Sequence, residues 1–555
     1  MKKKFLAYLL TLIVSFSCFG VYGGCNKPEG SSDPNVLNIK IYKGGHGTEY
    51  IQLVADKFNK LYEGQYSVEI LQPSTELVAS TVYKEISTGS NADIITGSTI
   101  NAMDGVANKD YGQTFTDITE SVLNQPAIKF DGSFEERTIL EKLGDVPSDY
   151  DEKQYNGNWY LIPYVNGVGG LAVNTKVLNN YGLEIPRTTN ELFAAADKIM
   201  EKASIQKVRP FTYAATGNNY AYPALLTWLS QYGGEEYYKK FMTFTDGDRE
   251  LTLNEAAELF NDSPELSAVM ELFVQLYDYN MQTSNVRSQT YDQAQNQFMR
   301  GNCAFYFVGD WMFNEEFTRN NKYINDITFV KPPMISALGT KVFGSETAYG
   351  FNDDLCDDIL CSIIDGVDAN KDKEVIESEV ESALGVQLQT EDVETIIKAR
   401  GMSQDRSGAG MVINYNSPKK ELAALFLRFF CSTECGEMVA ESIHCSSPYA
   451  VGSLKNSEYS WIKGSTSIIS NKYNLPMGSE ILGRRRKMGS LILFPGMGEV
   501  PVVTLTDEDH VVSIYDDETF EKTGSIKIYQ DKAKYFMNVL YEDALNCIAI
   551  GKWHN

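Results

Sequence analysis

Residues 36–61 read VLNIKIYKGGHGTEYIQLVADKFNKL, and the prediction of the fold starts from this stretch. Apolar and polar residues alternate over 36–42, which is typical of a half-buried strand, and Gly44–Gly47 ends that strand with a turn. From Tyr50 to Leu61 the apolar residues recur at helical spacing. The stretch therefore predicts a strand, a glycine-rich loop and a helix, which together open an α/β lobe.

The same alternation continues through the next 40 residues. A second strand is predicted at 68–71, a helix at 77–86 and a third strand at 92–98. Strands separated by helices favour a parallel sheet whose crossovers are right-handed. We therefore expect the first lobe to be built on a largely parallel sheet.

Two loops follow strands of this predicted sheet. Ligands of such sheets collect at the carboxyl ends of the strands, so the loops at 44–47 and 97–99 are candidate binding loops. Gly45 would let backbone N–H groups approach a ligand, and His46 and Ser98 would supply polar side chains. A plain tight turn remains the alternative for the first loop.

The first 24 residues are typical of a secretory leader. Lys2, Lys3 and Lys4 precede an apolar run over 5–14 that is too short to span a membrane as a helix. Cys25 then follows the sequence VYGG, which resembles the lipobox of bacterial lipoproteins, where the cysteine is acylated and becomes the new N-terminus. The resemblance implies lipidation at Cys25, and ordinary cleavage with secretion is the alternative.

Composition and charge narrow the classes of protein. The 555 residues carry a net charge of −25, and −28 once the three leader lysines are removed, which argues against nucleic acid as a partner. Hydrophobic residues make up 43% of the chain, enough for the cores of two or more lobes. Seven cysteines lie beyond the leader without a CxxC pair, and the four histidines form no HExxH motif. We expect no disulfide framework, no metal and no cofactor.

Five stretches, taken in order, resemble one known family. Residues 155–174 read YNGNWYLIPYVNGVGGLAVN and resemble the crossover segment of extracellular solute-binding proteins of carbohydrate ABC importers, the family of maltose-binding protein. Each of the other stretches alone is weak evidence for the family, but the order of these stretches over residues 36–450 is specific for it. They are IPRTTNEL at 185–192, 223–234 with its Trp and Gly-Gly pair, QFMRGNCAFYFVGDW at 297–311, and SPKKELAALFLRFFCSTE at 417–434.

The resemblance implies an α/β, two-lobe periplasmic-binding-protein-like (type II) fold with a cleft between the lobes. It further implies a non-catalytic, monomeric receptor that captures a sugar or oligosaccharide by hinge closure and delivers it to the permease subunits of an ABC importer. With Cys25 acylated, the protein would be held at the extracytoplasmic face of the cell membrane. Two alternatives stay open: a receptor or sensor for a peptide or an anionic solute, and an extracellular glycoside hydrolase with two carboxylates facing each other across the cleft.

The resemblance and the local composition together give an expected division of the chain. The expected segments are a signal peptide at 1–24, a flexible tether at 25–35, the first part of lobe 1 at 36–165, the first part of lobe 2 at 166–304, the second part of lobe 1 at 305–412, and the second part of lobe 2 with a C-terminal extension at 413–555.

A receptor for sugars needs aromatic platforms beside fixed hydrogen-bonding groups, because a sugar has apolar faces and a rim of hydroxyls. Trp311 follows a Gly-Asp turn at the matching family position, and Asp310 could accept bonds from two hydroxyls. Trp228 fits a buried helix equally well, because three leucines surround it. The expected ligand contacts are Gly45, His46, Ser98, Asn166, Asn218, Tyr222, Trp228, Asp310 and Trp311.

Two charged stretches stand apart. Residues 351–400 contain 14 acidic and 4 basic residues and are expected to form an acidic helical insertion. Within them, 368–379 places oxygen ligands as an EF-hand loop does, but Lys373 stands where that loop needs glycine, so a solvated helix end is favoured over calcium. The basic run at 484–487 fits a solvated loop better than a contact to an anionic ligand.

Overall fold

The computed structural model describes most of the chain between residues 30 and 477. The leader, Cys25, Ser98, Asn218, the predicted helix at 77–86 and the basic run at 484–487 lie outside the described residues. The described ranges are 30–42, 45–73, 90–97, 114–146, 157–203, 207–214, 222–243, 245–247, 249–261, 263–278, 281–284, 286–405 and 409–477, with short pieces at 514–515, 522–523, 533–534 and 537–538 and the single residues 541 and 545.

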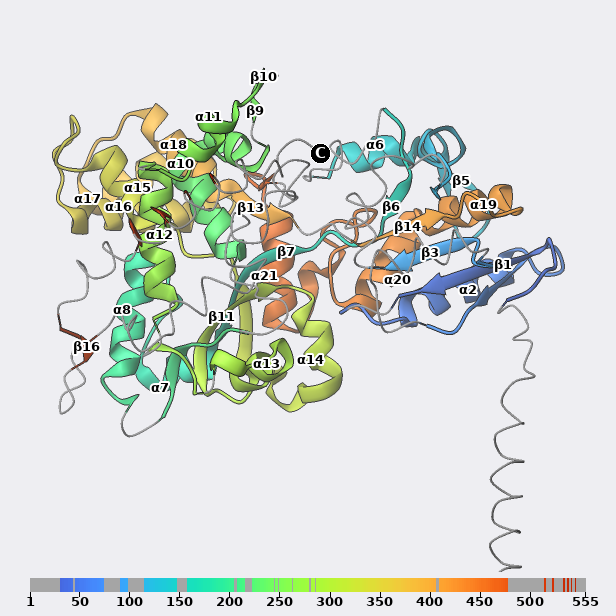
Figure 1. Ribbon diagram of the computed structural model, residues 1–555, viewed down its shortest axis with the longest axis horizontal. Helices are drawn as coiled ribbons and strands as arrows, with labels where there is room; N and C mark the ends of the chain where they lie inside the picture. The colour runs from blue at the N-terminus through green and yellow to red at the C-terminus, as the bar shows by residue number, and fades with distance from the viewer. Residues whose placement is uncertain are drawn as a thin grey trace, which may run out of the picture.

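The first lobe is built on a five-stranded sheet with the order β2-β1-β3-β14-β6 (Figure 1). β1 pairs in parallel with β2 and β3, as the sequence predicts, and β14 pairs antiparallel with β3 and β6. The strands begin and end within two residues of the predicted bounds in the N-terminal part. They are β1 (Val36–Ile41), β2 (Ser67–Ile70), β3 (Ile94–Gly97), β6 (Leu161–Pro163) and β14 (Gly410–Ile413).

Three helices cover this sheet and close its core. α2 (Glu49–Leu61) packs against α20 (Thr433–Ile443), and Phe58 of α2 contacts Phe426 and Phe429 of α19 (Lys420–Phe430) with ring centroids 5.3 and 5.6 Å apart. All three rings are fully buried. The first core is thus assembled from residues about 370 positions apart. Smaller elements complete the lobe: a π-helix at Thr119–Leu123, β4 (Pro126–Ile128), β5 (Phe134–Thr138) and α6 (Ile139–Gly144).

A buried ion pair ties the returning chain to the first sheet. Asp93 accepts hydrogen bonds from the backbone N–H of Asn38 at 2.8 Å and from Ser417 Oγ at 2.7 Å, and it pairs with Lys419 at 3.1 Å. Both charged side chains are about 95% buried or more. A buried charge is tolerated when it is paired and hydrogen-bonded, as Asp93 is here, so its role is structural.

The second lobe is built on a six-stranded mixed sheet. β7 (Val168–Asn174) is buried at every position and pairs antiparallel with β11 (Cys303–Gly309), β12 (Ile327–Val330) and β13 (Met402–Asp405). β8 (Arg209–Phe211) and β15 (Leu475–Met477) form its edges. A strand buried at every position belongs between two covering layers, and the side chains of β7 pack with α10 (Tyr222–Thr243) in one cluster and with α21 (Ser460–Ile469) in another.

Helices and short strands surround this second sheet. α8 begins after Thr188, whose hydroxyl accepts the N–H of Glu191 and so caps the first turn of the helix. The other elements are α7 (Thr175–Tyr181), α8 (Thr189–Met200), α10 (Tyr222–Thr243), β9 (Thr245–Asp246), β10 (Arg249–Glu250), α11 (Leu253–Glu258), α12 (Pro264–Leu276), α13 (Tyr291–Met299), α14 (Met312–Asn320), α15 (Ser336–Phe343) and α21 (Ser460–Ile469).

The acidic stretch forms three helices that share the core of the second lobe. These helices are α16 (Asp353–Asp368), α17 (Lys373–Leu384) and α18 (Thr390–Gly401), and α16 packs against α15. A buried polar cluster fixes them: Arg400 donates to both carboxylate oxygens of Asp368 at 2.9 and 2.6 Å, and Lys331 donates to the carbonyls of Arg400 and Gly401 at 2.6 and 3.0 Å. The expected insertion is therefore an integral part of this lobe.

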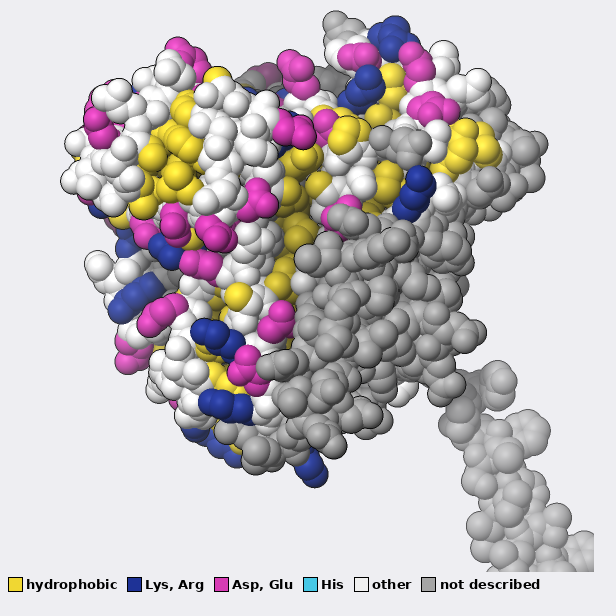
Figure 2. All heavy atoms as spheres, turned by 90° about the vertical axis from the view of Figure 1, so that its left-hand side faces the viewer, with side chains coloured by type: hydrophobic (Ala, Val, Ile, Leu, Met, Phe, Trp, Pro, Cys, Tyr) yellow, Lys and Arg dark blue, Asp and Glu magenta, His cyan; other side chains and the backbone are white. Residues whose placement is uncertain are grey.

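Many charges of the insertion are paired with cations. Asp365 pairs with Arg187 at 2.9 Å, and Figure 2 shows acidic and basic side chains mixed on the face that carries α8 and α17. The oxygens of the calcium-like loop are also engaged: Asp368 with Arg400, Asp372 with Lys472 and Glu379 with Lys371. These three carboxylates are therefore held by cations of the chain itself.

The path of the chain differs from the expected division after residue 304. Segment 305–412 was expected to return to the first lobe, yet β11 and β12 pair with β7, so the chain stays in the second lobe until β13. The return comes with β14, and α19 and α20 then pack in the first core rather than the second. The reason is the pairing of two fully buried strands: β11 pairs with β7 over five residues, from Phe305 beside Val173 to Gly309 beside Gly169.

Candidate functional site

Three crossovers join the lobes, and two of them meet at one place. The first is residues 164–167, the second lies between β13 and β14, and the third is 444–459, between α20 and α21. The backbone N–H of Asn166 donates to the carbonyl of Ser446 at 2.7 Å, which joins the first crossover to the third. We call the residues gathered here, 45–46, 164–168, 309–315 and 444–447, the interlobe junction.

Asp310 directly follows β11 at this junction. Its backbone N–H donates to the carbonyl of Val168 at 3.0 Å, and its own carbonyl accepts the indole N–H of Trp461 at 3.1 Å. The side chain is fully buried, and neither carboxylate oxygen has a side-chain partner among the described residues, although the backbone N–H groups of Val168, Asp310 and Trp311 partly offset the effect of burial on its pKa. Burial raises the pKa of Asp310 to about 7, because the charged form loses its hydration. A buried carboxyl without a partner is costly and is a mark of a functional site.

Trp311 lies between the two lobes. Its ring packs over Gly309, where an added Cβ would lie 1.7 Å from Cζ3, and near Gly45, where a Cβ would lie 3.0 Å from Cδ1. The side chain is partly buried and packs against the core of the first lobe, although its backbone belongs to the second. Two glycines thus provide the space that lets an indole bridge the lobes.

His46 lies in the loop after β1, as predicted. It is 8% exposed, and its ring meets that of Tyr164 edge-on at 5.9 Å. Tyr164 in turn stacks on Tyr50 at 4.8 Å. Burial lowers the pKa of His46 to about 4, so the ring is neutral at neutral pH, and its Nδ1 atom has no partner among the described residues.

Asn314 links the lobes by hydrogen bonds. From α14 in the second lobe, its Nδ2 donates to the carbonyl of Gly45 at 2.8 Å. Its Oδ1 lies 3.1 Å from Nδ1 of His444, which follows α20 in the first lobe. Phe317, one turn further along α14, contacts the ring of His444 in a tilted arrangement with centroids 4.6 Å apart. The contact between the lobes is therefore specific at this end of α14.

The junction gathers buried polar atoms that lack partners among the residues described. They are Nδ1 of His46, Nδ2 of Asn166, both carboxylate oxygens of Asp310 and Oγ of Ser446. They come from the loop after β1, the first crossover, the end of β11 and the third crossover. Since buried polar groups are normally hydrogen-bonded, a set of such atoms from both lobes in one place fits a site that a polar ligand completes.

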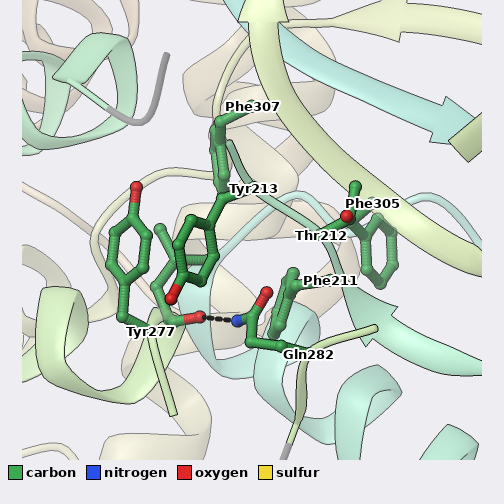
Figure 3. Close-up of a pocket in the computed structure, with 8 residues that line it drawn as sticks. Phe211, Thr212, Tyr213, Tyr277, Gln282, Phe305 and Phe307 are labelled. Carbon is green, nitrogen blue, oxygen red and sulfur yellow. Dashed lines mark hydrogen bonds between the residues drawn. The ribbon is translucent and has the colours of Figure 1, made fainter. Parts of the chain in front are cut away.

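A separate small cavity lies inside the second lobe (Figure 3). It has room for about one water molecule. Gln282 donates from Nε2 to the carbonyl of Leu276 at 2.6 Å, while its Oε1 has no partner among the described residues. The lining is mostly aromatic and belongs to the core of one lobe, so the cavity does not lie between the lobes. Its lining residues are Phe211, Thr212, Tyr213, Leu276, Tyr277, Gln282, Phe305 and Phe307.

The structure gathers five of the nine expected contact residues at the junction: Gly45, His46, Asn166, Asp310 and Trp311. Trp228 is elsewhere: it is fully buried in the second core, and its indole N–H donates to the carbonyl of Pro333 at 2.8 Å. Its position therefore supports the buried-helix interpretation and not a ligand contact. Tyr222 opens α10, and its side chain lies outside the described residues, as do Ser98 and Asn218.

Sequence reasoning missed several residues of the junction. Asn314, His444 and Ser446 were not among the expected contacts. The available signal was the polar run HCSS directly after a helix, at the point where the chain crosses to the second lobe. Among the residues described, no group of three or more His, Cys, Asp or Glu side chains is placed to hold a metal ion. No described helix is long and apolar enough to cross a bilayer.

Fold and site together define a two-lobe binding protein whose lobes are joined by crossovers. The chain belongs to the family of bacterial extracellular solute-binding proteins, whose model matches residues 44–352, more than half of the chain. Members of this family are non-catalytic receptors of ABC importers, so the protein is a solute-binding protein and not an enzyme. The resemblance found in the sequence is confirmed.

Solved structures agree on the fold. The acarbose-binding GacH receptor of Streptomyces glaucescens is 13% identical, with a TM-score of 0.53, over 91% of this chain and 98% of its own. Maltose-bound MalE3 of T. maritima is 14% identical, with a TM-score of 0.53, over 90% and 99%. Lmo0181 of Listeria monocytogenes, solved with cycloalternan, is 12% identical, with a TM-score of 0.51, over 91% and 99%. Among curated proteins, none matches the sequence. The predicted type II binding-protein fold is confirmed.

Proposed function

We propose that this solute-binding protein captures a sugar or oligosaccharide at the interlobe junction and delivers it to the permease of an ABC importer. The observation that carries the proposal is the set of unpartnered polar atoms of His46, Asn166 and Asp310 beside the indole of Trp311. An aromatic face with hydrogen-bonding groups around it matches a sugar, which has apolar faces and a rim of hydroxyls. The sugars named for the three solved structures support this class of ligand.

Each group would have a distinct role in capture. Trp311 provides the apolar platform, Asp310 accepts hydroxyl protons, and the amide of Asn166 donates to a ring or hydroxyl oxygen. The neutral ring of His46 accepts a hydrogen bond from the sugar, or donates one to it, from the side of the first lobe. Because these groups come from both lobes, a ligand that contacts all of them binds the closed arrangement more tightly than an open one, and this difference drives closure.

The lipid anchor is part of the same proposal. Acylation of Cys25 would hold the receptor at the extracytoplasmic face of the membrane, since the two chains of a diacylglyceryl group bind stably where one binds only marginally. Residues 25–35 would then act as the tether between the membrane and the first lobe. Metabolic labelling with palmitate tests this: label on the wild type and none on Cys25→Ala is expected, and equal labelling of both would contradict it.

A thermal-shift screen of the mature chain tests the ligand class. The panel contains mono- and oligosaccharides, with peptides and amino acids as the comparison. A ligand that binds only the folded state stabilises it by about 2.7 kcal/mol at 100 times its Kd, which gives a measurable shift. We expect shifts with sugars that Trp311→Ala abolishes and that Trp228→Phe, a change in the second core, retains. Shifts with peptides alone would overturn the proposal.

A further inference from the structure

We propose that the interlobe junction selects uncharged sugars and rejects sugars that carry a carboxylate or a phosphate, and that Asp310 makes this distinction. The inference rests on the proposed function and narrows its ligand class. Four observations support it. The carboxylate of Asp310 has no side-chain partner among the described residues, and backbone hydrogen bonds fix the position of the residue. A second carboxyl group, that of Glu315, belongs to the junction, and the cation that acts on Glu315 is already paired with another acid.

The backbone on both sides of the Asp310 side chain is fixed, while the carboxylate has no side-chain partner among the described residues. The N–H of Asp310 bonds to Val168, and its carbonyl accepts from Trp461, so the residue cannot swing away without breaking the end of β11. Its side chain is fully buried, and both oxygens lack side-chain partners among the described residues. Above its pKa of about 7, the carboxylate therefore presents two acceptors and no donor to whatever fills the junction.

Glu315 adds a second acidic group at the same place. Its Oε1 lies beside Gly45, where an added Cβ would be 2.6 Å away, and its Oε2 accepts the amide of Gln295 at 2.6 Å. Burial raises the pKa of Glu315. Burial is the main cause of the raised pKa of the Cys445 thiol, and the charges of Asp310 and Glu315 add to it. Both carboxyl groups belong to segment 309–315 of the interlobe junction.

The cation that acts on Glu315 already forms an ion pair with another acid. Arg319, on the last turn of α14, lowers the pKa of Glu315 but forms an ion pair with Asp292 of α13, and about half of its side chain is exposed. No cation contributes to the pKa shift of Asp310 among the described groups. An anionic ligand would therefore meet carboxylates here without a described counter-charge.

The chemistry of the two ligand classes separates them at such a site. Adjacent hydroxyls of a neutral sugar donate to the two oxygens of Asp310, and bonds to a charged acceptor are the strong ones. A carboxylate or phosphate offers only acceptors and adds a like charge where water is excluded. It binds only if Asp310 first takes up a proton. Affinity for an anionic sugar should consequently fall as the pH rises above about 7, near the pKa of this buried group, while affinity for a neutral sugar does not fall.

Calorimetric titration of matched pairs tests the inference. The pairs are glucose and glucuronate, galactose and galacturonate, maltotriose and maltotriose oxidised at its terminal C6, and trehalose and trehalose 6-phosphate. For every pair in which at least one sugar binds, we expect the neutral sugar to bind at least about 30-fold more tightly than the anionic one at pH 8. The reason is that the negative charge of the anionic sugar would face the carboxylates of the junction. Asp310→Asn should narrow that ratio about tenfold or more, and Asp365→Asn, which removes a charge from the exposed face of α16, should leave it unchanged.

The outcomes separate this inference from the proposed function. Equal affinity within a pair, or preference for the anionic member, overturns the selectivity and leaves sugar capture intact. Binding of peptides with no response to any sugar overturns the proposed function and this inference with it. If Asp310→Asn fails to fold, the wild type alone decides: a carboxylated sugar must bind more weakly at pH 8 than at pH 6, and a pH-independent affinity would contradict the role of Asp310.

Discussion

Replacing Gly309 by alanine should displace Trp311 and weaken ligand capture without touching the ligand. A Cβ at position 309 would lie 1.7, 2.1 and 2.2 Å from Cζ3, Cη2 and Cε3 of the indole. Carbon atoms pack best at about 3.5–4.0 Å, so the ring must move by roughly 2 Å. It would then leave its place beside Gly45 and lose its alignment with the neighbouring polar groups. We expect an affinity loss close to that of Trp311→Ala, about 30-fold or more, which corresponds to about 2 kcal/mol for a tryptophan anchor.

A double-mutant cycle decides whether Gly309 acts through Trp311. Calorimetry would measure binding of the tightest sugar from the screen to the wild type, to Gly309→Ala, to Trp311→Ala and to the double variant. If the glycine serves the indole, Gly309→Ala costs less than about 0.5 kcal/mol once Trp311 is gone. Gly144→Ala is the matched control, because a Cβ there meets nothing within 4 Å. A full additional loss in the Trp311→Ala background, or unchanged affinity of Gly309→Ala, would refute the reasoning.

Three further predictions concern the junction and the helical insertion. Asp310→Asn should raise the free energy of unfolding by on the order of 2–4 kcal/mol at pH 8 and by much less near pH 4, because a folded-state pKa of about 7 lies above the unfolded value and the wild type therefore loses stability as the pH rises from about 4 to 7. Urea titrations of the two proteins that show no such pH dependence would contradict this prediction. Asn314→Ala removes two hydrogen bonds between the lobes and should weaken sugar binding about 5- to 30-fold in calorimetry, whereas Asn320→Ala, whose partners lie in the second lobe, should not weaken it. Equal effects of the two variants would argue against a role of Asn314 in closure. Asp368→Asn should destabilise the second lobe by about 2 kcal/mol in urea, because it leaves the buried Arg400 guanidinium without its carboxylate, while Asp365→Asn should cost less than about 1 kcal/mol; similar small losses would show that the buried pair contributes little.

The sequence predicted the local elements of the first lobe well. Alternation over 36–42 and the helical spacing over 50–61 correspond to β1 and α2 with bounds that differ by one residue, because both elements bury one regular face. The parallel pairing of β1 with β2 and β3 also followed from the alternation of strands and helices. Periodicity is a local property, and it sufficed where neighbours in sequence are neighbours in space.

The assignment of segments to lobes was harder to predict. β11 is apolar at every position, so its pattern fits any buried sheet and gives no information on which lobe it joins. Its pairing with β7 spans more than 130 residues and depends on the register of both strands. The same holds for α19, whose apolar face would have suited either core but which meets Phe58 in the first.

The candidate site was predicted in part, for a physical reason. Asp310 and Trp311 belong to a recognisable motif, and His46 comes directly after a predicted strand. Each could therefore be identified as a candidate from the residues next to it in the sequence. Asn314, His444 and Ser446 matter because three distant segments meet, and neither their spacing nor their residue types indicate that meeting. Trp228 shows the opposite case: an aromatic in a promising stretch whose role is to fill the core.

The most direct test of the account is hydrogen–deuterium exchange of the mature chain with and without the tightest sugar from the screen. If the ligand is captured between the lobes, protection must increase together at four places: the loop around His46, the crossover at 164–168, the start of α14 at 310–315, and residues 444–447. Protection confined to the second lobe around Phe211, Tyr277 and Gln282 would place the ligand in the small cavity of that lobe instead. That result would contradict capture at the interlobe junction.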